Sequence, residues 1–588
     1  MEKIGGAALA ELLSNYGVKM VFGVPGGQTL SFYDGIQQLD PKIRHILTRD
    51  EKSGPLMAIG YSKVTKSPGV CDGTAGPGAA NMLPSVIEAF TSSTPLIVLT
   101  SNIVTKWMGR GASQELDHFA LFDTFVKKNI RPKNTNDIPE VVRRAFRLAT
   151  TGRPGPVHID LPQDILEGKM EEGAYVGSTG FVDSTEEAFS HYPGYRPGPD
   201  PNLVLKALEL IERSSNPIIF AGGGALMSQA GSEVQNLAEQ IGAAVVTTLT
   251  AKGIIAENHP LSLGCVGRQG YRPSANKALK EADLVIALGT KFAQVSTNNW
   301  TLIDVKRAKI IHIDIDPSEL SKFYKAQVSI NADVRQSLQE ILKALASRRS
   351  RKEGASTRLA EWKKRIETLR KEWERLYDRI SSDDSDPMRA ARVLKEIQKA
   401  LPNKSVLVSS GSFSGAFAGS FYNVTGGGGI PRFIQARGMA GTEPALPLAI
   451  GAALGVEDQS KVLVITGDGG FGYHISELET AKRMGLALPI VVMNNNSLAW
   501  MKLIQEEKFG SRYISSGYLP ELSYATVAEA FGCHGIRIEK SRDLGPAIEN
   551  AVKSDTVTVV EVMTDPKDCS STHMAGDLLA KEEGSSAY

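Results

Sequence analysis

The chain has 588 residues, more than one hydrophobic core usually supports, so we expect about three domains. It is 42% hydrophobic and 22% charged, and its 66 lysine and arginine residues balance 65 aspartate and glutamate residues. This near-neutral charge, without a block of like charge, argues against nucleic acid or an anionic membrane as a partner.

The N-terminus has neither the pattern of an export signal nor that of a membrane span. Residues 8–16 follow an amphipathic helix pattern, and no segment approaches the roughly 18 uncharged apolar residues that a membrane helix needs. The four cysteines are far apart in the sequence, at Cys71, Cys265, Cys533 and Cys569. This spacing is typical of isolated thiols in a reducing compartment. We therefore expect a cytoplasmic protein without a membrane segment.

Three stretches alternate short apolar runs with helix-like segments, which predicts α/β domains with parallel sheets. They cover residues 1–170, 195–345 and 387–566. Residues 346–386 are highly charged with periodic apolar positions, which predicts a helical linker, and residues 567–588 form a polar tail that is either a lid or disordered. The predicted fold class is α/β, with three doubly wound parallel-sheet domains.

In the third stretch, two buried strands end in polar residues. One runs into Gly-Asp-Gly-Gly at residues 467–470, and the other, residues 488–493, ends just before Asn495. The carboxyl ends of neighbouring parallel strands meet, so Asp468 and Asn495 can converge. Their oxygens and a nearby backbone carbonyl, which we assign to Ser497, suit Mg²⁺ or Ca²⁺ when a diphosphate adds further oxygens. A lone Gly-Asp-Gly is most often only a turn, but the strand–helix–strand context favours a metal site.

This segment resembles the thiamine-diphosphate signature of the decarboxylase and acetolactate synthase superfamily. Segments similar to acetolactate synthase occur in the same order along nearly the whole chain, at residues 21–27, 74–81, 151–156 and 312–317. The resemblance implies a pyrimidine-binding, a middle and a diphosphate-binding domain, with thiamine diphosphate and Mg²⁺ as cofactors. In the family, pyrimidine and diphosphate bind to different subunits, so the resemblance also implies a homodimer or homotetramer.

The resemblance assigns roles to individual residues. Glu51 matches the activating glutamate, whose carboxyl pairs with the aminopyrimidine and favours the imino tautomer that removes the thiazolium C2 proton. Gln114 matches a glutamine that lines the reaction space. Asp468, Asn495 and Ser497 form the metal set. The cofactor-binding positions are Gly26, Gly27, Gly76, Pro77, Gly78, Asn81, Gly411, Ser412, Ser414, Gly441, Thr442, Gly467, Gly469 and Gly470.

Several pocket positions depart from the biosynthetic synthases. Gln163, Val295 and Ile504 replace a lysine, an arginine and a tryptophan, and Thr442 replaces the methionine that commonly props the cofactor into its bent shape. The Leu-Pro-Gln-Asp turn, the Gly-Asp-Gly-Gly-Phe signature and the Ile-Gln-Glu-Glu-Lys segment are similar to those of catabolic, flavin-free acetolactate synthases. Glu443 is either an extra acid near the thiazolium or a salt-bridged structural residue.

Flavin-contact positions of relatives align with residues 220–224 and 289–291 and with Asp314 and Asp333. A Gly-rich turn after a strand is more often only a turn, and this domain has lost its nucleotide in several relatives, so FAD is the disfavoured alternative. Near Gln114, His118 is either an acid/base group or a helix-surface histidine.

The resemblance implies an enzyme that decarboxylates a 2-oxo acid and joins the product to a second carbonyl. Pyruvate as substrate and acetolactate as product are our first choice. The main alternative is another thiamine-diphosphate lyase or decarboxylase, with a different 2-oxo acid or an acyl-CoA. An inactive assembly subunit is a third reading, against which the intact Glu51, Asp468 and Asn495 count.

Overall fold

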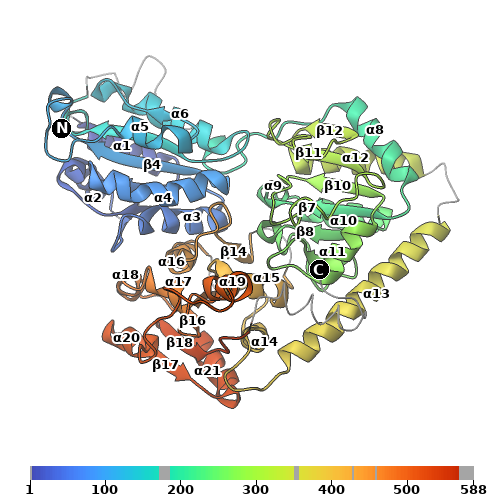
Figure 1. The fold of residues 1–588 in the computed structure, drawn as a ribbon. Helices are drawn as coiled ribbons and strands as arrows, with labels where there is room; N and C mark the ends of the chain where they lie inside the picture. The colour runs from blue at the N-terminus through green and yellow to red at the C-terminus, as the bar shows by residue number, and fades with distance from the viewer. Residues whose placement is uncertain are drawn as a thin grey trace. The chain divides into compact units, whose positions relative to one another are not determined.

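A computed structural model describes residues 3–40, 42–170, 186–349, 356–426, 430–456 and 460–568. It contains three six-stranded sheets in which every strand pair is parallel (Figure 1). The predicted α/β class with three sheet domains is therefore confirmed, whereas the tail beyond residue 568 lies outside the described residues. Within the described ranges, no helix has the length and hydropathy needed to cross a membrane.

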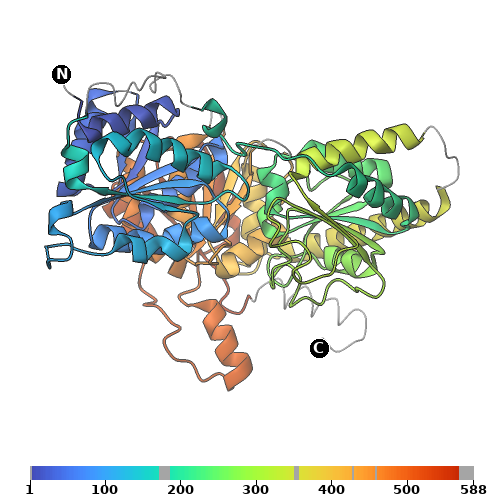
Figure 2. The ribbon, with the colours of Figure 1, turned by 90° about the horizontal axis from the view of Figure 1, so that it is seen from above.

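The first sheet has the strand order β2-β1-β3-β4-β6-β5, with helices on both faces (Figure 2). Strands β3, β4, β5 and β6 are buried throughout, as expected for a parallel sheet covered on both sides, whereas the edge strand β2 has only one buried residue. The strands are β1 (Met20–Gly23), β2 (Arg44–Leu47), β3 (Gly69–Gly73), β4 (Leu96–Asn102), β5 (Asn129–Ile130) and β6 (Val157–Pro162). The helices are α1 (Gly5–Asn15), α2 (Leu30–Gln38), α3 (Ser53–Thr65), α4 (Pro77–Thr91), α5 (His118–Phe122), α6 (Ile138–Thr150) and α7 (Gln163–Glu167).

The second sheet has the strand order β12-β11-β10-β7-β8-β9. Its strands are β7 (Pro217–Ala221), β8 (Ala244–Thr247), β9 (Ser262–Cys265), β10 (Leu284–Leu288), β11 (Lys309–Asp314) and β12 (Val328–Asn331). Its helices are α8 (Pro201–Arg213), α9 (Gly223–Met227), α10 (Gly231–Ile241), α11 (Pro273–Glu281) and α12 (Val334–Arg349).

The third sheet has the strand order β14-β13-β15-β16-β18-β17. Its strands are β13 (Val406–Ser409), β14 (Phe433–Gln435), β15 (Val462–Gly467), β16 (Pro489–Asn494), β17 (His534–Ile538) and β18 (Thr558–Met563). The helices of this region are α14 (Ala390–Ala400), α15 (Ser412–Phe421), α16 (Ala445–Gly455), α17 (Asp468–Gly472), α18 (Glu477–Arg483), α19 (Ala499–Phe509), α20 (Tyr524–Ala530) and α21 (Ser541–Lys553).

The segment predicted as a linker contains one long helix, α13 (Ser356–Ser381). Trp362, Ile366 and Leu369 pack into the core on one face of the second sheet. Trp373 and Leu376 belong to the core around the third sheet. The helix thus has a charged face and an apolar face. The apolar face packs first against the domain of the second sheet and then against the domain of the third sheet.

Contacts along the chain divide it into two compact units. One contains Met1–Tyr195, Ala436–Asp458 and Tyr473–Leu486, and the other contains Arg196–Gln435, Gln459–Gly472 and Ala487–Tyr588. Helices α16 and α18 therefore belong with the first sheet. The backbones of α3 and α16 approach so closely that a Cβ at Gly60 would lie 2.0 Å from Leu448 O, and one at Gly451 would lie 1.9 Å from Met57 O.

Candidate functional site

Three predicted loops follow the carboxyl ends of β1, β2 and β3, which are neighbours in the first sheet. Ligands of open α/β sheets bind at such an edge, where the strand order reverses. Gly26 follows β1, and a Cβ there would lie 2.0 Å from Thr74 Oγ1, so only glycine fits. Gly78 is also close to Thr74, with 2.8 Å from its Cβ position to Cγ2, whereas nothing lies within 4 Å of a Cβ on Gly27.

The structure brings Glu51 and Asn81 together. Glu51 follows β2 and is half-buried, and Asn81 lies in the first turns of α4, which begins at Pro77. Asn81 Nδ2 donates to Glu51 Oε2 over 3.1 Å. The bond orients the carboxylate that the resemblance implies for cofactor activation.

Gln114 lies beside the Gly76 loop. A Cβ on Gly76 would lie 2.6 Å from Gln114 O, and both residues have positive φ, +63° and +64°. Gln114 Oε1 accepts from Gln28 Nε2 over 2.8 Å, and Gln28 Oε1 accepts from Thr74 Oγ1 over 2.8 Å. Gln28 was missed from the sequence, although its place directly after Gly27 pointed to this loop.

The predicted Gly441 and Thr442 lie in the segment before α16. Buried Glu88 holds this segment, because it accepts from the backbone N–H groups of residues 438 and 439 over 2.9 and 2.6 Å. The carboxylate oxygens of Glu443 lie 2.8 and 3.0 Å from the Cβ position of Gly441.

In the second compact unit, the structure brings Asp468, Asn495 and Ser497 together. Asp468 follows β15, and its Oδ2 accepts from the backbone N–H groups of Asn495 and Ser497, each over 3.2 Å. Its Oδ1 accepts from Gly469 N over 2.7 Å. Asn495 Oδ1 accepts from Ser497 Oγ over 3.0 Å.

Burial raises the pKa of Asp468 to about 6, although backbone N–H groups oppose this shift. A divalent cation would supply the missing positive charge and favour the carboxylate. A carboxylate oxygen and an amide oxygen that follow two neighbouring strands, β15 and β16, are also hard ligands of the kind that Mg²⁺ takes. The residues therefore fit the predicted metal.

Gly411, Ser412 and Ser414 follow β13, the neighbour of β15. Gly411 is the N-cap of α15, and Ser412 is exposed with φ +60°. Ser414 is buried, and its hydroxyl bonds Ser410 Oγ over 2.7 Å and donates to Gly411 O over 3.1 Å. The Ser414 hydroxyl thus bonds within its own loop, and its contact with the cofactor stays a prediction.

The glycines after β15 differ in their surroundings. A Cβ on Gly469 would lie 2.6 Å from Tyr518 Oη, a neighbour that the sequence did not point to. Gly467 is open, with only Met493 O at 3.9 Å from its Cβ position, and Gly470 is buried in α17.

The positions that depart from biosynthetic synthases lie in different settings. Gln163 begins α7 and donates to Glu167 Oε1 over 2.8 Å. Val295 is half-buried in the middle domain, and Ile504 is half-buried on α19. On the same helix, Trp500 packs edge-on against Phe413 of α15, with ring centroids 5.0 Å apart.

In the middle domain, the glycine turn after β7 packs against the turn after β10. A Cβ on Gly222 would lie 2.2 Å from Gly289 O, and one on Gly224 would lie 2.8 Å from Gly289 Cα. Asp333 accepts from Ser228 Oγ over 2.7 Å and from Arg196 Nη1 over 3.3 Å. These glycines therefore allow close packing of two turns, and the Asp333 carboxylate forms hydrogen bonds with other residues of the same domain.

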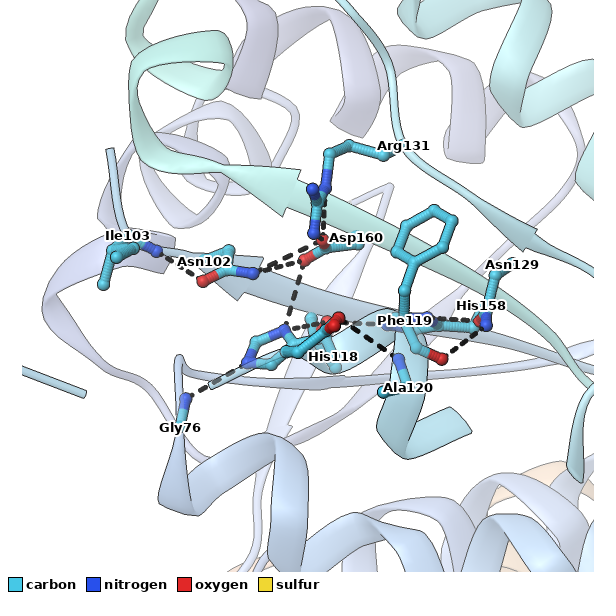
Figure 3. A network of polar contacts seen from close by, with 12 residues as sticks. Gly76, Asn102, Ile103, His118, Phe119, Ala120, Asn129, Arg131, His158 and Asp160 are labelled. Carbon is cyan, nitrogen blue, oxygen red and sulfur yellow. Dashed lines mark hydrogen bonds and ion pairs between the residues drawn. The ribbon is translucent and has the colours of Figure 1, made fainter. Parts of the chain in front are cut away.

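His118 is fully buried, so its reading as a helix-surface histidine is wrong. Its Nε2 accepts from Gly76 N over 3.2 Å, and its Nδ1 lies 3.1 Å from Asp160 Oδ1 (Figure 3). Both ring nitrogens therefore have protein partners.

Three domain families match the chain in the order of its sheets. Residues 3–121 match "Thiamine pyrophosphate enzyme, N-terminal TPP binding domain", residues 204–341 the central domain, and residues 415–562 the C-terminal TPP binding domain of the same enzymes. Gly411, Ser412 and Ser414 lie just before the third match.

Relatives of similar length also match. A probable acetolactate synthase large subunit of Methanococcus aeolicus is 34% identical over 576 residues, covering 96% of this chain and 92% of that protein. One from Methanocaldococcus jannaschii is 34% identical over 574 residues, with the same coverage of 96% and 92%. The acetolactate synthase large subunit of Corynebacterium glutamicum is 32% identical over 556 residues, covering 93% and 84%. The chain therefore belongs to the thiamine pyrophosphate enzymes, as an acetolactate synthase-like member with all three of their domains.

Proposed function

We propose that this enzyme converts two molecules of pyruvate and one proton into acetolactate and carbon dioxide. The observation that carries the proposal is the Glu51 carboxylate held by Asn81 at the edge of the first sheet, in a chain that matches acetolactate synthase large subunits over nearly its full length. Thiamine diphosphate, when bound, supplies a nucleophilic carbon and accepts the electrons that decarboxylation releases.

The protein residues activate, anchor and shape the site. Glu51 would hold a proton against the pyrimidine, and Asn81 would keep its carboxylate in place. Gln114, oriented through Gln28, would line the space where the 2-oxo acid reacts. Asp468, Asn495 and the Ser497 backbone would hold Mg²⁺ against the diphosphate, a role supported by the hydrogen bonds that join these residues and by the raised pKa of Asp468.

Product analysis tests the proposal. The purified protein is incubated with thiamine diphosphate, Mg²⁺ and a panel of 2-oxo acids, and products are identified by mass spectrometry. Acetolactate and carbon dioxide formed in equal amounts from pyruvate support the proposal. Decarboxylation of pyruvate without acetolactate, or no reaction with pyruvate, contradicts it.

A second candidate is a thiamine-diphosphate lyase or decarboxylase with another 2-oxo acid or an acyl-CoA. The specific support is that Gln163, Val295, Thr442 and Ile504 stand where biosynthetic synthases have other pocket residues. Turnover of another acid in the panel, or of an acyl-CoA, without turnover of pyruvate would favour this candidate.

The assembly is proposed to be a homodimer or homotetramer, because the family completes its site with residues from two subunits. Sedimentation equilibrium measures the subunit number, and a monomer that is active at all concentrations would contradict this proposal. The buried thiols of Cys71, Cys265 and Cys533 are compatible with the proposed cytoplasmic location, which cell fractionation tests.

We also propose that the middle domain works without FAD. The glycines after β7 give room to the turn at Gly289, and Asp333 is held by Arg196 and Ser228. Protein purified under native conditions should lack flavin absorption, and added FAD should not change the thermal unfolding midpoint. A tightly bound flavin would contradict the proposal.

A further inference from the structure

A buried hydrogen-bond network links the last strands of the first sheet to the Gly76 loop (Figure 3). Its members are Asn129 on β5, His158 and Asp160 on β6, Thr100 on β4 and His118 at the start of α5. Both histidines, Thr100 and Asp160 are completely buried. In such surroundings each polar atom needs a partner of the right kind, so the positions of the protons can be worked out.

One end of the network is set by a backbone carbonyl. Asn129 Nδ2 donates to Phe119 O over 3.0 Å, so the Oδ1 atom of Asn129 faces His158. His158 Nδ1 lies 2.8 Å from this oxygen and must donate to it. The Nε2 atom of a neutral His158 then carries the lone pair, and the Thr100 hydroxyl donates to it over 2.7 Å. Burial lowers the pKa of His158 to about 3, in agreement with a neutral ring.

The other end is set by a backbone N–H. Gly76 N can only donate, so His118 Nε2 must carry a lone pair and the proton must be on Nδ1. This Nδ1–H donates to Asp160 Oδ1 over 3.1 Å, and Thr100 Oγ1 accepts at 3.0 Å. Both ends thus lead to the same arrangement, with two neutral rings that are both protonated on Nδ1.

Asp160 anchors this arrangement as a carboxylate. Burial alone would raise its pKa, but the hydrogen bond from His118 and the charge of Arg131 lower the pKa below its usual value. Arg131 Nε donates to Asp160 Oδ2 over 2.5 Å, and Asn102 Nδ2 donates to Oδ1 over 3.1 Å. His118, His158 and Asp160 also have the grouping of a metal site, but their ligand atoms are already used in these bonds.

The bond from Gly76 ends on a peptide in an unusual conformation. Gly76 has φ +63° and ψ −106°, which residues with a side chain rarely adopt, and it abuts the backbone of Gln114. Directly after it, α4 begins and carries Asn81, the partner of Glu51. His118 therefore connects the sheet interior to the loops that hold the predicted pyrimidine-side residues.

We propose that His118 is a positioning residue for thiamine diphosphate, and that the lone pair on its Nε2, provided by the Nδ1-protonated tautomer, holds the Gly76 peptide in its binding conformation. This inference rests on the proposed pyrimidine side of the site. It assigns no proton transfer to His118, since neither ring nitrogen is free for one.

Two substitutions separate the two halves of the imidazole. In His118→Gln, Oε1 can take the place of Nε2 and accept from Gly76 N, whereas the donor to Asp160 is lost. In His118→Asn, Nδ2 can take the place of Nδ1 and donate to Asp160, whereas the acceptor for Gly76 is lost. Both remove the same buried ring, so a purely structural role would affect them alike.

The test is the dissociation constant of thiamine diphosphate, measured by calorimetry with saturating Mg²⁺. We expect His118→Asn to weaken binding up to about tenfold, because one lost hydrogen bond is worth up to about 1.4 kcal/mol. We expect the dissociation constant of His118→Gln to stay within about threefold of the wild-type value. Equal affinities of the two variants, or tighter binding by His118→Asn, would overturn the proposal.

Thr100→Val is the matched control for damage to the network. It removes the hydroxyl between the two histidines but leaves Asp160 as the acceptor for His118 Nδ1–H. We expect a lower unfolding midpoint with an unchanged dissociation constant for thiamine diphosphate. A loss of affinity equal to that of His118→Asn would mean that general loosening explains both, and would overturn the proposal.

Two further measurements keep the inference testable on its own. If His118→Asn does not fold, ¹⁵N-histidine NMR of the wild type tests the tautomer directly, and the signal of His118 is the one that disappears in His118→Gln. We expect this signal to show a neutral ring protonated on Nδ1. A ring protonated on Nε2, or a charged ring, contradicts the proposal. If the wild-type protein binds thiamine diphosphate but does not convert pyruvate, the proposed reaction is wrong. The ratio of the thiamine diphosphate dissociation constants of His118→Asn and His118→Gln would still test the role of His118.

Discussion

At the scale of single residues, the described polar contacts divide the predicted site residues into two kinds. Glu51 and Asp468 keep carboxylate oxygens near backbone or amide donors at the edge of a sheet, where a ligand can complete their surroundings. Ser414 and Asp333 have the residue types expected for ligand contacts, but their polar atoms are bound within the protein. Residue type alone therefore does not identify a binding group.

Glu51→Gln should abolish most of the turnover without preventing cofactor binding. The amide cannot exchange a proton with the pyrimidine, and general acid–base groups of this kind contribute about 10²–10⁴-fold to a rate. Steady-state turnover of pyruvate and calorimetry with thiamine diphosphate measure the two effects. Gln38→Glu, an exposed change on α2, is a control that should leave both unchanged. Full turnover by Glu51→Gln would show that the carboxylate does not activate the cofactor.

Asp468→Asn should raise the Mg²⁺ concentration needed for half-maximal activity. The substitution keeps the size of the side chain but removes the charge, and hydrogen bonds or ligands to a charged group are worth roughly 1.5–3 kcal/mol, or about 10–100-fold in affinity. Removal of Mg²⁺ with a chelator should abolish activity, and added Mg²⁺ should restore it.

The matched control for Asp468 is Asp565→Asn, a carboxylate that follows β18 instead of β15. It should leave the Mg²⁺ requirement unchanged. If Asp468→Asn shows the same Mg²⁺ dependence as the wild type, the metal is held elsewhere.

At the scale of elements, α13 is the clearest case in which packing changes the meaning of a sequence pattern. Its exposed face is rich in charge, as expected of a solvated linker. Its opposite face contributes Trp362, Ile366 and Leu369 to one core and Trp373 and Leu376 to another. The helix therefore joins two domains within one compact unit and also completes the hydrophobic core of each.

Leu369→Ala should destabilise the protein by about 2–5 kcal/mol, because it leaves a cavity at a site with no exposed surface. Lys364→Ala on the exposed face of the same helix is the control and should have little effect. Thermal unfolding followed by circular dichroism compares the two variants. Equal midpoints would show that α13 contributes no packing energy to the domains.

At the scale of the whole molecule, three buried histidines make stability depend on pH. Burial lowers the pKa of His158 to about 3 and that of His312 and His474 to about 4, from an ordinary value of 6.5. Each of these histidines is therefore protonated in the unfolded chain at a pH where it is still neutral in the folded one. Their contribution to stability should be greatest above about pH 6.5 and should fall as the pH drops towards about 4, whereas buried acids with raised pKa values, such as Asp468 and Asp568, act in the opposite direction.

Unfolding midpoints measured between about pH 7 and about pH 4 check this prediction. His312→Gln is an informative variant, because glutamine can keep the donor to Thr290 O but does not titrate in this range. The midpoint of this variant relative to that of the wild type should rise as the pH drops, because the variant lacks one of the three histidine contributions. A difference between the two midpoints that does not change with pH would contradict the prediction.

Much of the fold could be predicted from the sequence, because long apolar runs and turn residues are local signals. The central strands β15 and β16 lie where those runs predict strands. The short edge strand β5 (Asn129–Ile130) was not predicted, because two residues carry no periodicity and pair only when β6 is in place. β14 and β17 were missed for a related reason, since edge strands depend on their neighbours.

For the site, the sequence by itself determined which residues follow which strands. Motif order placed Glu51, Asp468 and Asn495 at strand ends, and the geometry of parallel sheets brought Asp468 and Asn495 together. Only the tertiary structure decided that Asn81 bonds Glu51, that Gln28 bonds Gln114, and that Ser414 is bound within its own loop.

The same division holds for His118. A lone histidine near Gln114 offers no sequence signal for burial or tautomer, so its reading stayed open between surface and catalysis. The tertiary structure decided it, because partners from strands β4 and β6 and from the Gly76 loop surround the ring. A proton's position in a buried network depends on every donor and acceptor around it, and those come together only when distant parts of the chain fold.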